Sequence, residues 1–129
     1  MHVPPGFTTL FPYLFVDGAR AYLDFLVRGL GGEIVGVHQT PDGVVRNAQL
    51  RFGDTIIMVS EVGEGREPTR GTYYLYVEDA DAAMARGVAA GGAMESEVGD
   101  RVYGDRQGGL RDPAGNIWWL SQRLAPGPY

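Results

Sequence analysis

Short apolar runs separated by glycine and polar turns mark out the first half of the chain. Residues 11–15 form an apolar and aromatic run typical of a buried strand. A helix is predicted over residues 19–30, with Asp17 as its cap and Gly31-Gly32 as its end. The apolar residues at helical spacing that support it are Ala19, Leu23, Leu26 and Leu30.

Three further strands complete this first unit. They are predicted over residues 34–39, 44–52 and 55–60, separated by the Pro41-Asp42-Gly43 turn and the Gly53-Asp54 hairpin. The order of elements is therefore β-α-β-β-β.

The same pattern restarts after a polar linker over residues 63–71. A strand over 72–77 precedes a helix over 80–90, which Asp79 caps and Gly91-Gly92 ends. Strands follow over residues 94–98, 107–111 and 117–122, the last two joined by the Asp112–Asn116 turn, in which Asp112 and Asn116 are expected to brace the backbone. This unit is also β-α-β-β-β.

The two halves align at an offset of about 60 residues. The matching positions are the helix starts (Val16-Asp17-Gly18-Ala19 and Val77-Glu78-Asp79-Ala80), the helix ends (Gly31-Gly32 and Gly91-Gly92) and Leu50-Arg51 with Leu110-Arg111. We therefore expect an α+β fold of two tandem βαβββ modules, about 7–62 and 71–124, within a single domain over residues 1–129. Two such units side by side can curl into a half-barrel cup, and its concave face is the natural ligand site.

Composition and charge narrow the possible functions. The 129 residues carry a net charge of −5 without a basic run, which argues against binding to nucleic acid or an anionic membrane. The chain has no cysteine, so disulfides, thiolate metal sites and cysteine nucleophiles are excluded. Residues 1–11 lack the features of a signal peptide, and no apolar run is long enough to span a bilayer. The sequence predicts a cytoplasmic protein.

The last third holds the most specific motifs. They are Tyr103-Gly104-Asp105-Arg106 and the run from Arg111-Asp112-Pro113-Ala114-Gly115-Asn116 to Ile117-Trp118-Trp119-Leu120. With Pro12-Tyr13-Leu14 and Gly53-Asp54, they resemble the vicinal oxygen chelate superfamily, which includes glyoxalase I, extradiol dioxygenases and bleomycin resistance proteins. The resemblance covers residues 7–122. It implies the paired βαβββ fold and a homodimer with cups completed across the subunit interface.

Enzymes of that superfamily usually hold a divalent metal through one His or Glu on each of four strands. The corresponding positions here are Phe11, Gln49 (or Asn47 if the register slips), Thr72 and Trp119. None is a strong ligand for zinc, iron, nickel or manganese, and the chain has only two histidines, His2 and His38. We therefore expect neither a metal site nor a cofactor.

Aromatic residues are the stronger signal for binding. Alternation places Phe11, Tyr13 and Phe15 on one face of their strand, and Thr72, Tyr74 and Tyr76 on one face of theirs. Trp119 would face the cup and Trp118 a helix. These rings could stack on a ligand or simply fill the cup. The candidate ligand-binding residues are Phe11, Tyr13, Asn47, Gln49, Thr72, Tyr74, Tyr103, Arg106 and Trp119.

Several charged residues could have either of two roles, one in a ligand site and one in the structure. Arg106 could orient an anionic or carbonyl group of a ligand, or form an ion pair with Asp105 or Asp112. Arg111 could meet a ligand carboxylate or lie on the surface. Glu61 and Glu64 could be an acid–base pair or belong to a solvated loop edge.

The leading hypothesis is a metal-independent protein that binds a small molecule, cationic or aromatic, similar to the bleomycin resistance proteins that sequester a drug. One alternative is a lyase, isomerase or dioxygenase-like enzyme that uses oxygen ligands such as Glu61. The other is a packed cup without a ligand. Catalytic residues are not assigned.

Overall fold

The structure, a computed structural model, describes residues 2–129 and divides into two compact units. The first comprises residues up to 27 and 31–69, and the second residues 28–30 and 70–129. Each contains a four-stranded sheet, and the element order is β-α-β-β-β twice. The predicted α+β fold of two tandem βαβββ modules is confirmed. Among residues 2–129, no helix combines the length and the apolar character needed to cross a membrane.

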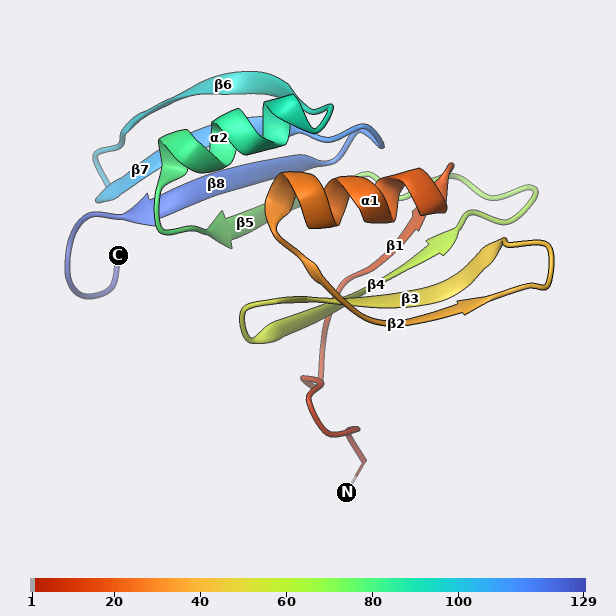
Figure 1. Cartoon of the computed structure of the whole chain (residues 1–129). Coiled ribbons are helices and arrows are strands. Elements are labelled where there is room, and N and C mark those ends of the chain that lie inside the picture. Colours follow the sequence, from red (N-terminus) through yellow and green to blue (C-terminus); the bar gives the residue numbers. More distant parts are fainter. Residues whose placement is uncertain (1) are drawn as a thin grey trace. The chain divides into compact units, whose positions relative to one another are not determined.

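The first unit begins with β1 (Tyr13–Val16) and most of α1 (Ala19–Leu30), the last residues of which, 28–30, count with the second unit. Its other strands are β2 (Glu33–Gln39), β3 (Val45–Phe52) and β4 (Thr55–Glu61). The strand order in the sheet is β1-β4-β3-β2, with β1 parallel to β4 and the remaining pairs antiparallel. α1 lies over this sheet (Figure 1).

Alternation along the strands gives the first sheet an apolar face and a mixed face. The buried side chains that form the apolar face include Leu14, Val16, Ala48, Leu50 and Val59. The apolar stripe of α1, which includes Leu23 and Leu26, is buried as well. The intervening strand residues, such as Tyr13 and Asn47, lie on the opposite face of the sheet.

The N-terminus of α1 is not capped by Asp17, so that prediction was wrong. Gly18 occupies the capping position with a φ of 81°, which favours glycine, and no side chain of that residue can cap the helix. Instead, the Glu61 carboxylate at the end of β4 accepts hydrogen bonds from the backbone N–H groups of Gly18 and Ala19, both at 2.9 Å. The capping group comes from the neighbouring strand in space, so local sequence could not reveal it.

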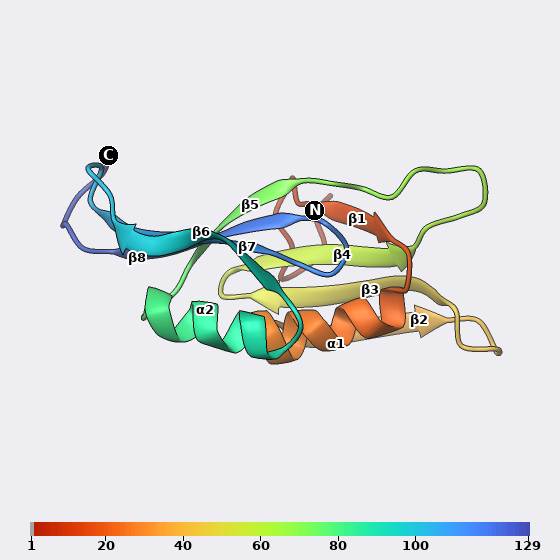
Figure 2. The same cartoon turned by 90° about the horizontal axis from the view of Figure 1, so that it is seen from above.

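The second unit repeats the first with β5 (Thr72–Tyr76), α2 (Ala80–Ala89), β6 (Ala93–Asp100), β7 (Asp105–Arg111) and β8 (Ile117–Arg123). Its strand order, β5-β8-β7-β6, corresponds to that of the first sheet, and α2 packs on β6, β7 and β8 (Figure 2). Asp79 caps α2 as predicted, accepting from the Ala82 N–H at 3.1 Å. The Gln122 amide oxygen accepts from the Ala80 N–H at 3.0 Å, in the place where Glu61 acts in the first unit.

Glycine lets α2 and β6 approach β7 closely. A Cβ atom at Gly108 would lie 2.7 Å from Val98 Cγ2 and 2.8 Å from Met84 Cε. Both distances are shorter than ordinary Cβ contacts, so a side chain at Gly108 would force Val98 and Met84 to shift.

The predicted element bounds differ from the observed ones mainly where pairing extends or shortens a strand. β1 begins at Tyr13 rather than at residue 11, and β6 runs from Ala93 to Asp100 rather than over 94–98. In the turn before β8, Asp112 accepts from the Ala114 and Asn116 N–H groups at 2.9 Å, and Asn116 accepts from the Gly71 N–H at 2.8 Å. The predicted bracing role of Asp112 and Asn116 is confirmed.

Candidate functional site

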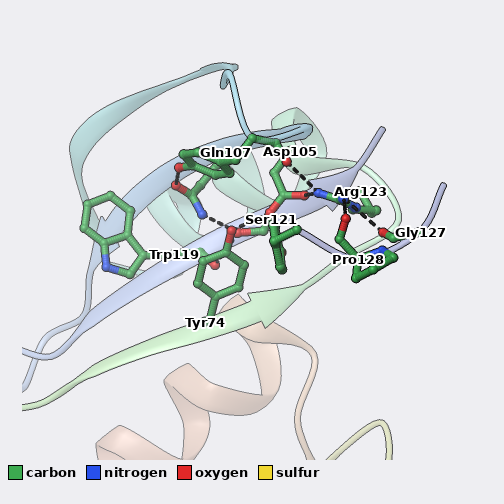
Figure 3. Close-up of polar contacts among 10 residues, drawn as sticks. Tyr74, Asp105, Gln107, Trp119, Ser121, Arg123, Gly127 and Pro128 are labelled. Carbon is green, nitrogen blue, oxygen red and sulfur yellow. Dashed lines mark hydrogen bonds and ion pairs between the residues drawn. The ribbon is translucent and has the colours of Figure 1, made fainter. Parts of the chain in front are cut away.

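The face of the second sheet opposite α2 gathers aromatic and polar side chains. The strand register places Tyr74 of β5 beside Trp119 of β8, and Gln107 of β7 beside Ser121 (Figure 3). Trp118 lies on the other face, where it is only 4% exposed. The predicted division of the two tryptophans between the sheet faces is therefore observed.

An open pocket of about 460 Å³ lies on this face. We call it the Trp119 pocket; it is lined by Tyr74, Ser96, Arg101, Tyr103, Gln107 and Trp119. Its volume falls within the range of small-molecule sites, and its aromatic walls with a few polar groups match their usual composition.

The Asp105 carboxylate lies beneath one wall of the pocket and is 0% exposed. It accepts hydrogen bonds from the Tyr74 hydroxyl, from the Tyr129 hydroxyl at 2.8 Å and from Arg123 Nη1 at 3.0 Å. Burial alone would raise the pKa of Asp105, but the hydrogen bonds from Tyr74 and Arg123 and the positive charge of Arg123 outweigh it and lower this pKa. Asp105 is therefore held as a carboxylate.

The same contacts fix Tyr74. Burial, followed by the hydrogen bond to Asp105, raises the pKa of the Tyr74 hydroxyl above its usual range, so this group stays protonated and donates to the carboxylate. Arg123 completes the arrangement by donating to the carbonyl oxygens of Tyr103 at 2.8 Å and Gly127 at 3.0 Å (Figure 3).

A second set of hydrogen bonds holds the floor of the pocket. The Tyr103 hydroxyl donates to the Gln107 amide oxygen, and Gln107 Nε2 donates to Ser121 Oγ at 2.8 Å. The Trp119 indole N–H donates to Thr72 Oγ1 at 2.9 Å. The orientation of the rings is thus set before any ligand arrives.

Arg101 brings positive charge to the pocket, and the sequence reasoning missed it. Its Nη2 donates to the carbonyl oxygens of Glu97 at 2.7 Å and Gln107 at 2.9 Å, and lies 3.4 Å from Ser96 Oγ. Arg101 sits in the loop between β6 and β7, where alternation gives no direction. Its place just before the Tyr103-Gly104 pair was the available signal.

The first unit carries a related arrangement at an offset of 61 residues, with Tyr13 and Ser60 in the places of Tyr74 and Ser121. Tyr13 stacks on Phe15 with ring centroids 4.5 Å apart, and its oxygen accepts from Ser60 Oγ at 2.9 Å and Asn47 Nδ2 at 3.2 Å.

The two other first-unit candidates, Gln49 and Phe11, are placed by different contacts. Gln49 donates to the Asn47 amide oxygen, whereas Phe11 precedes β1 and its ring lies 5.4 Å from that of Phe7. The structure therefore places Phe11, Tyr13, Asn47 and Gln49 in the first unit, and Thr72, Tyr74, Tyr103 and Trp119 on one face of the second.

Arg106 lies apart from these candidates. Arg106 lies between Asp105 and Gln107 in β7. Because successive side chains of a strand point to opposite faces, Arg106 points to the α2 side of the sheet. There it forms ion pairs with Asp81 at 2.7 Å and Asp100 at 2.9 Å, and these hydrogen bonds raise the pKa of Arg106. The predicted ion-pair partners, Asp105 and Asp112, were wrong because they lie on other faces of the strand and turn.

The residues at the superfamily's metal positions do not fit a divalent metal. Phe11 and Trp119 offer no ligand atom, the Asn47 and Gln49 amides bond to each other, and Thr72 Oγ1 accepts from an indole. Among residues 2–129, no three His, Asp or Glu side chains gather as a metal site. Glu61, one oxygen ligand considered for the enzyme alternative, accepts from the α1 N-terminus instead.

Comparison with known proteins identifies relatives in sequence and in fold. An uncharacterised protein of Mycobacterium bovis is 34% identical, over 88% of this chain and 82% of its own length, and one of Mycobacterium tuberculosis is 34% identical over 88% and 73%. The crystal structure of TioX from Micromonospora sp. ML1 superposes with a TM-score of 0.73 at 27% identity, covering 89% of this chain and 99% of TioX.

A second structure shares the fold. TnmS3, an antibiotic binding protein from Streptomyces sp. CB03234, superposes with a TM-score of 0.72 at 23% identity, covering 95% of this chain and 98% of TnmS3. The family model that describes the Glyoxalase/Bleomycin resistance protein/Dioxygenase superfamily matches residues 7–120. With the two βαβββ modules and their shared topology, this match shows that the chain belongs to that superfamily.

Proposed function

We propose that this protein binds a small molecule without a metal and without catalysis, in the Trp119 pocket. The observation that carries the proposal is the pocket of about 460 Å³ whose rings are already held in place by hydrogen bonds. Such a pocket gains affinity by burying a flat ligand against Trp119 and Tyr74, with little ordering cost on binding.

Two further observations favour binding over catalysis. The family's metal positions hold no suitable ligands, and Glu61, the best oxygen ligand considered for the enzyme alternative, is engaged at the α1 N-terminus. The shared fold of TnmS3, itself described as an antibiotic binding protein, is consistent with sequestration of a drug-like molecule.

Fluorescence titration of chelator-treated protein tests the proposal. A panel of drug-sized aromatic compounds should include members that change tryptophan emission in a saturable way and produce heat in calorimetry, equally with and without chelator. Trp119→Phe should abolish the emission change because Trp118 is buried on the other face. No saturable signal or heat from any compound would contradict the proposal, and a signal that requires added metal would refute its metal independence.

The homodimer that the family resemblance implies is part of the proposal. Light scattering should give twice the mass of one chain at micromolar concentration. A single-chain mass across the concentration range would remove the dimer from the account and leave the Trp119 pocket, which lies within one unit, in place.

A further inference from the structure

We infer that the Trp119 pocket selects flat aromatic ligands bearing an anionic group, such as a carboxylate, and that Arg101 is the residue that recognises this group. The inference rests on the proposed binding function and specifies its ligand class. It departs from the cationic ligand that the sequence alone also allowed.

The charge balance of the pocket lining is positive. Of its six lining residues, Arg101 is the only one with a charged side chain, the others being Tyr74, Ser96, Tyr103, Gln107 and Trp119. The neighbouring Asp105 carboxylate is compensated by Arg123 and also accepts from two tyrosine hydroxyls. A cationic ligand would therefore meet the Arg101 charge without a free carboxylate to offset it.

Arg101 also differs from other arginines of the chain in having no carboxylate partner. Arg51, Arg106, Arg111 and Arg123 all form ion pairs with Asp or Glu. Among residues 2–129, Arg101 forms none, and its hydrogen bonds leave from Nη2 alone, to Ser96, Glu97 and Gln107. A guanidinium has five N–H donors in a planar fork, so Nη1 and Nε keep donors for a ligand carboxylate.

The tyrosine hydroxyls and the indole N–H of the lining cannot replace Arg101 in this role. The Tyr74 and Tyr103 hydroxyl protons are committed to Asp105 and Gln107, so these hydroxyls face a ligand with their acceptor oxygens. Trp119 directs its indole N–H to Thr72, which leaves its ring to contact an aromatic surface. A pocket that offers aromatic rings and one guanidinium is suited to a ligand that is an aromatic acid.

Three naphthalenes of nearly the same shape test the inference on the unmodified protein: 2-naphthoate, neutral 2-naphthamide and the cationic 2-naphthylmethylammonium. Calorimetric titrations at pH 7 should show 2-naphthoate binding about tenfold more tightly than the amide, since hydrogen bonds to charged groups are the stronger kind, and the cation binding most weakly. Equal or tighter binding of the amide or the cation overturns the inference while leaving the binding function standing. If none of the three binds and the wider compound panel is also silent, the proposed function fails with it.

Variants assign the preference to Arg101. Arg101→Gln should lose the carboxylate preference, whereas Arg101→Lys, which keeps the charge but not the fork, should retain part of it. Arg111→Gln is the matched control, because Arg111 lies in the same sheet but pairs with Glu95 outside the pocket lining. Should Arg101→Gln fail to fold, Arg101→Lys and the three-ligand comparison still decide the matter. An unchanged preference in a folded Arg101→Gln protein contradicts the role of Arg101.

Discussion

Asp105 shows how a single buried carboxylate organises the pocket wall. It orients Tyr74 and Tyr129 through their hydroxyls and neutralises Arg123, which in turn holds the carbonyl oxygens of Tyr103 and Gly127. An isolated buried charge would be costly, and here two tyrosine hydroxyls and the Arg123 guanidinium offset that cost. The carboxylate belongs to the structural support of the site, while Tyr74 forms its surface.

We expect Asp105→Asn to lower the thermal unfolding midpoint by several degrees at pH 7, because Arg123 loses its partner and an amide N–H₂ group faces hydroxyl donors. Since the folded pKa of Asp105 is lowered, its contribution to stability is complete above the unfolded pKa of about 3.9 and is lost as the pH falls through the folded value. The difference in midpoint between wild type and variant should therefore shrink below about pH 4.

Thermal unfolding by circular dichroism from pH 7 to pH 3 measures this difference. Asp54→Asn, in the exposed hairpin turn of the first unit, serves as the control and should unfold like the wild type. A midpoint difference that stays constant or grows on acidification would contradict the carboxylate's assigned role.

At the scale of elements, strand ends act as helix caps in both units. Glu61 at the end of β4 binds two N–H groups of the α1 N-terminus, and Gln122 at the end of β8 binds one of α2. Glu61 and Gln122 occupy equivalent positions, so in both units a strand residue holds the start of the helix to its own sheet. This tertiary contact is therefore repeated in the two modules. A carboxylate also interacts favourably with the positive end of the helix dipole.

Glu61→Ala should destabilise the protein by about 1 kcal/mol, the usual cost of losing a helix cap. Chemical denaturation with urea measures the free energy of unfolding. Glu64→Ala, in the exposed linker, is the matched control and should be neutral. Equal stabilities for the two variants would show that Glu61 does not cap α1.

Close packing between layers depends on Gly108. Gly108→Ala should cost about 1–3 kcal/mol of stability, because the added methyl group overlaps half-buried Val98 and buried Met84. Gly63→Ala is the control, since its nearest neighbour would lie 3.9 Å away. A Gly108→Ala protein as stable as wild type in the same urea experiment would mean that the layers can separate without cost.

The sequence predicted the elements well because their signals are local. Helical spacing, glycine stops and the Asp112 turn predicted α1, α2 and the order of elements along the chain. Alternation placed Trp119 and Trp118 on opposite faces of their strand. The α1 cap and the partners of Arg106 were missed, since Glu61, Asp81 and Asp100 are brought there by strand pairing and helix packing. Arg101 was missed because its loop has no periodicity from which to read a direction.

At the scale of the whole molecule, duplication has produced two sheets with the same topology and different exposed chemistry. Tyr13 and Tyr74 occupy equivalent positions, yet Tyr13 accepts hydrogen bonds from Ser60 and Asn47 whereas Tyr74 donates to a buried carboxylate. In the place of Met58 in the first unit, the second has Trp119. Fold is thus shared between the modules, and the candidate site depends on side chains that differ between them.

The most direct test of the binding site uses the two indole N–H groups, which give separate signals in a ¹H–¹⁵N spectrum. Trp119 bonds to Thr72 on the pocket face, and Trp118 bonds to buried Asp112 on the other. Titration with 2-naphthoate should shift the Trp119 signal, assigned by its absence in Trp119→Phe, progressively to saturation while Trp118 stays nearly fixed. A saturable shift of Trp118 with Trp119 unmoved would contradict a ligand site in the Trp119 pocket, as would an unchanged spectrum across the whole compound panel.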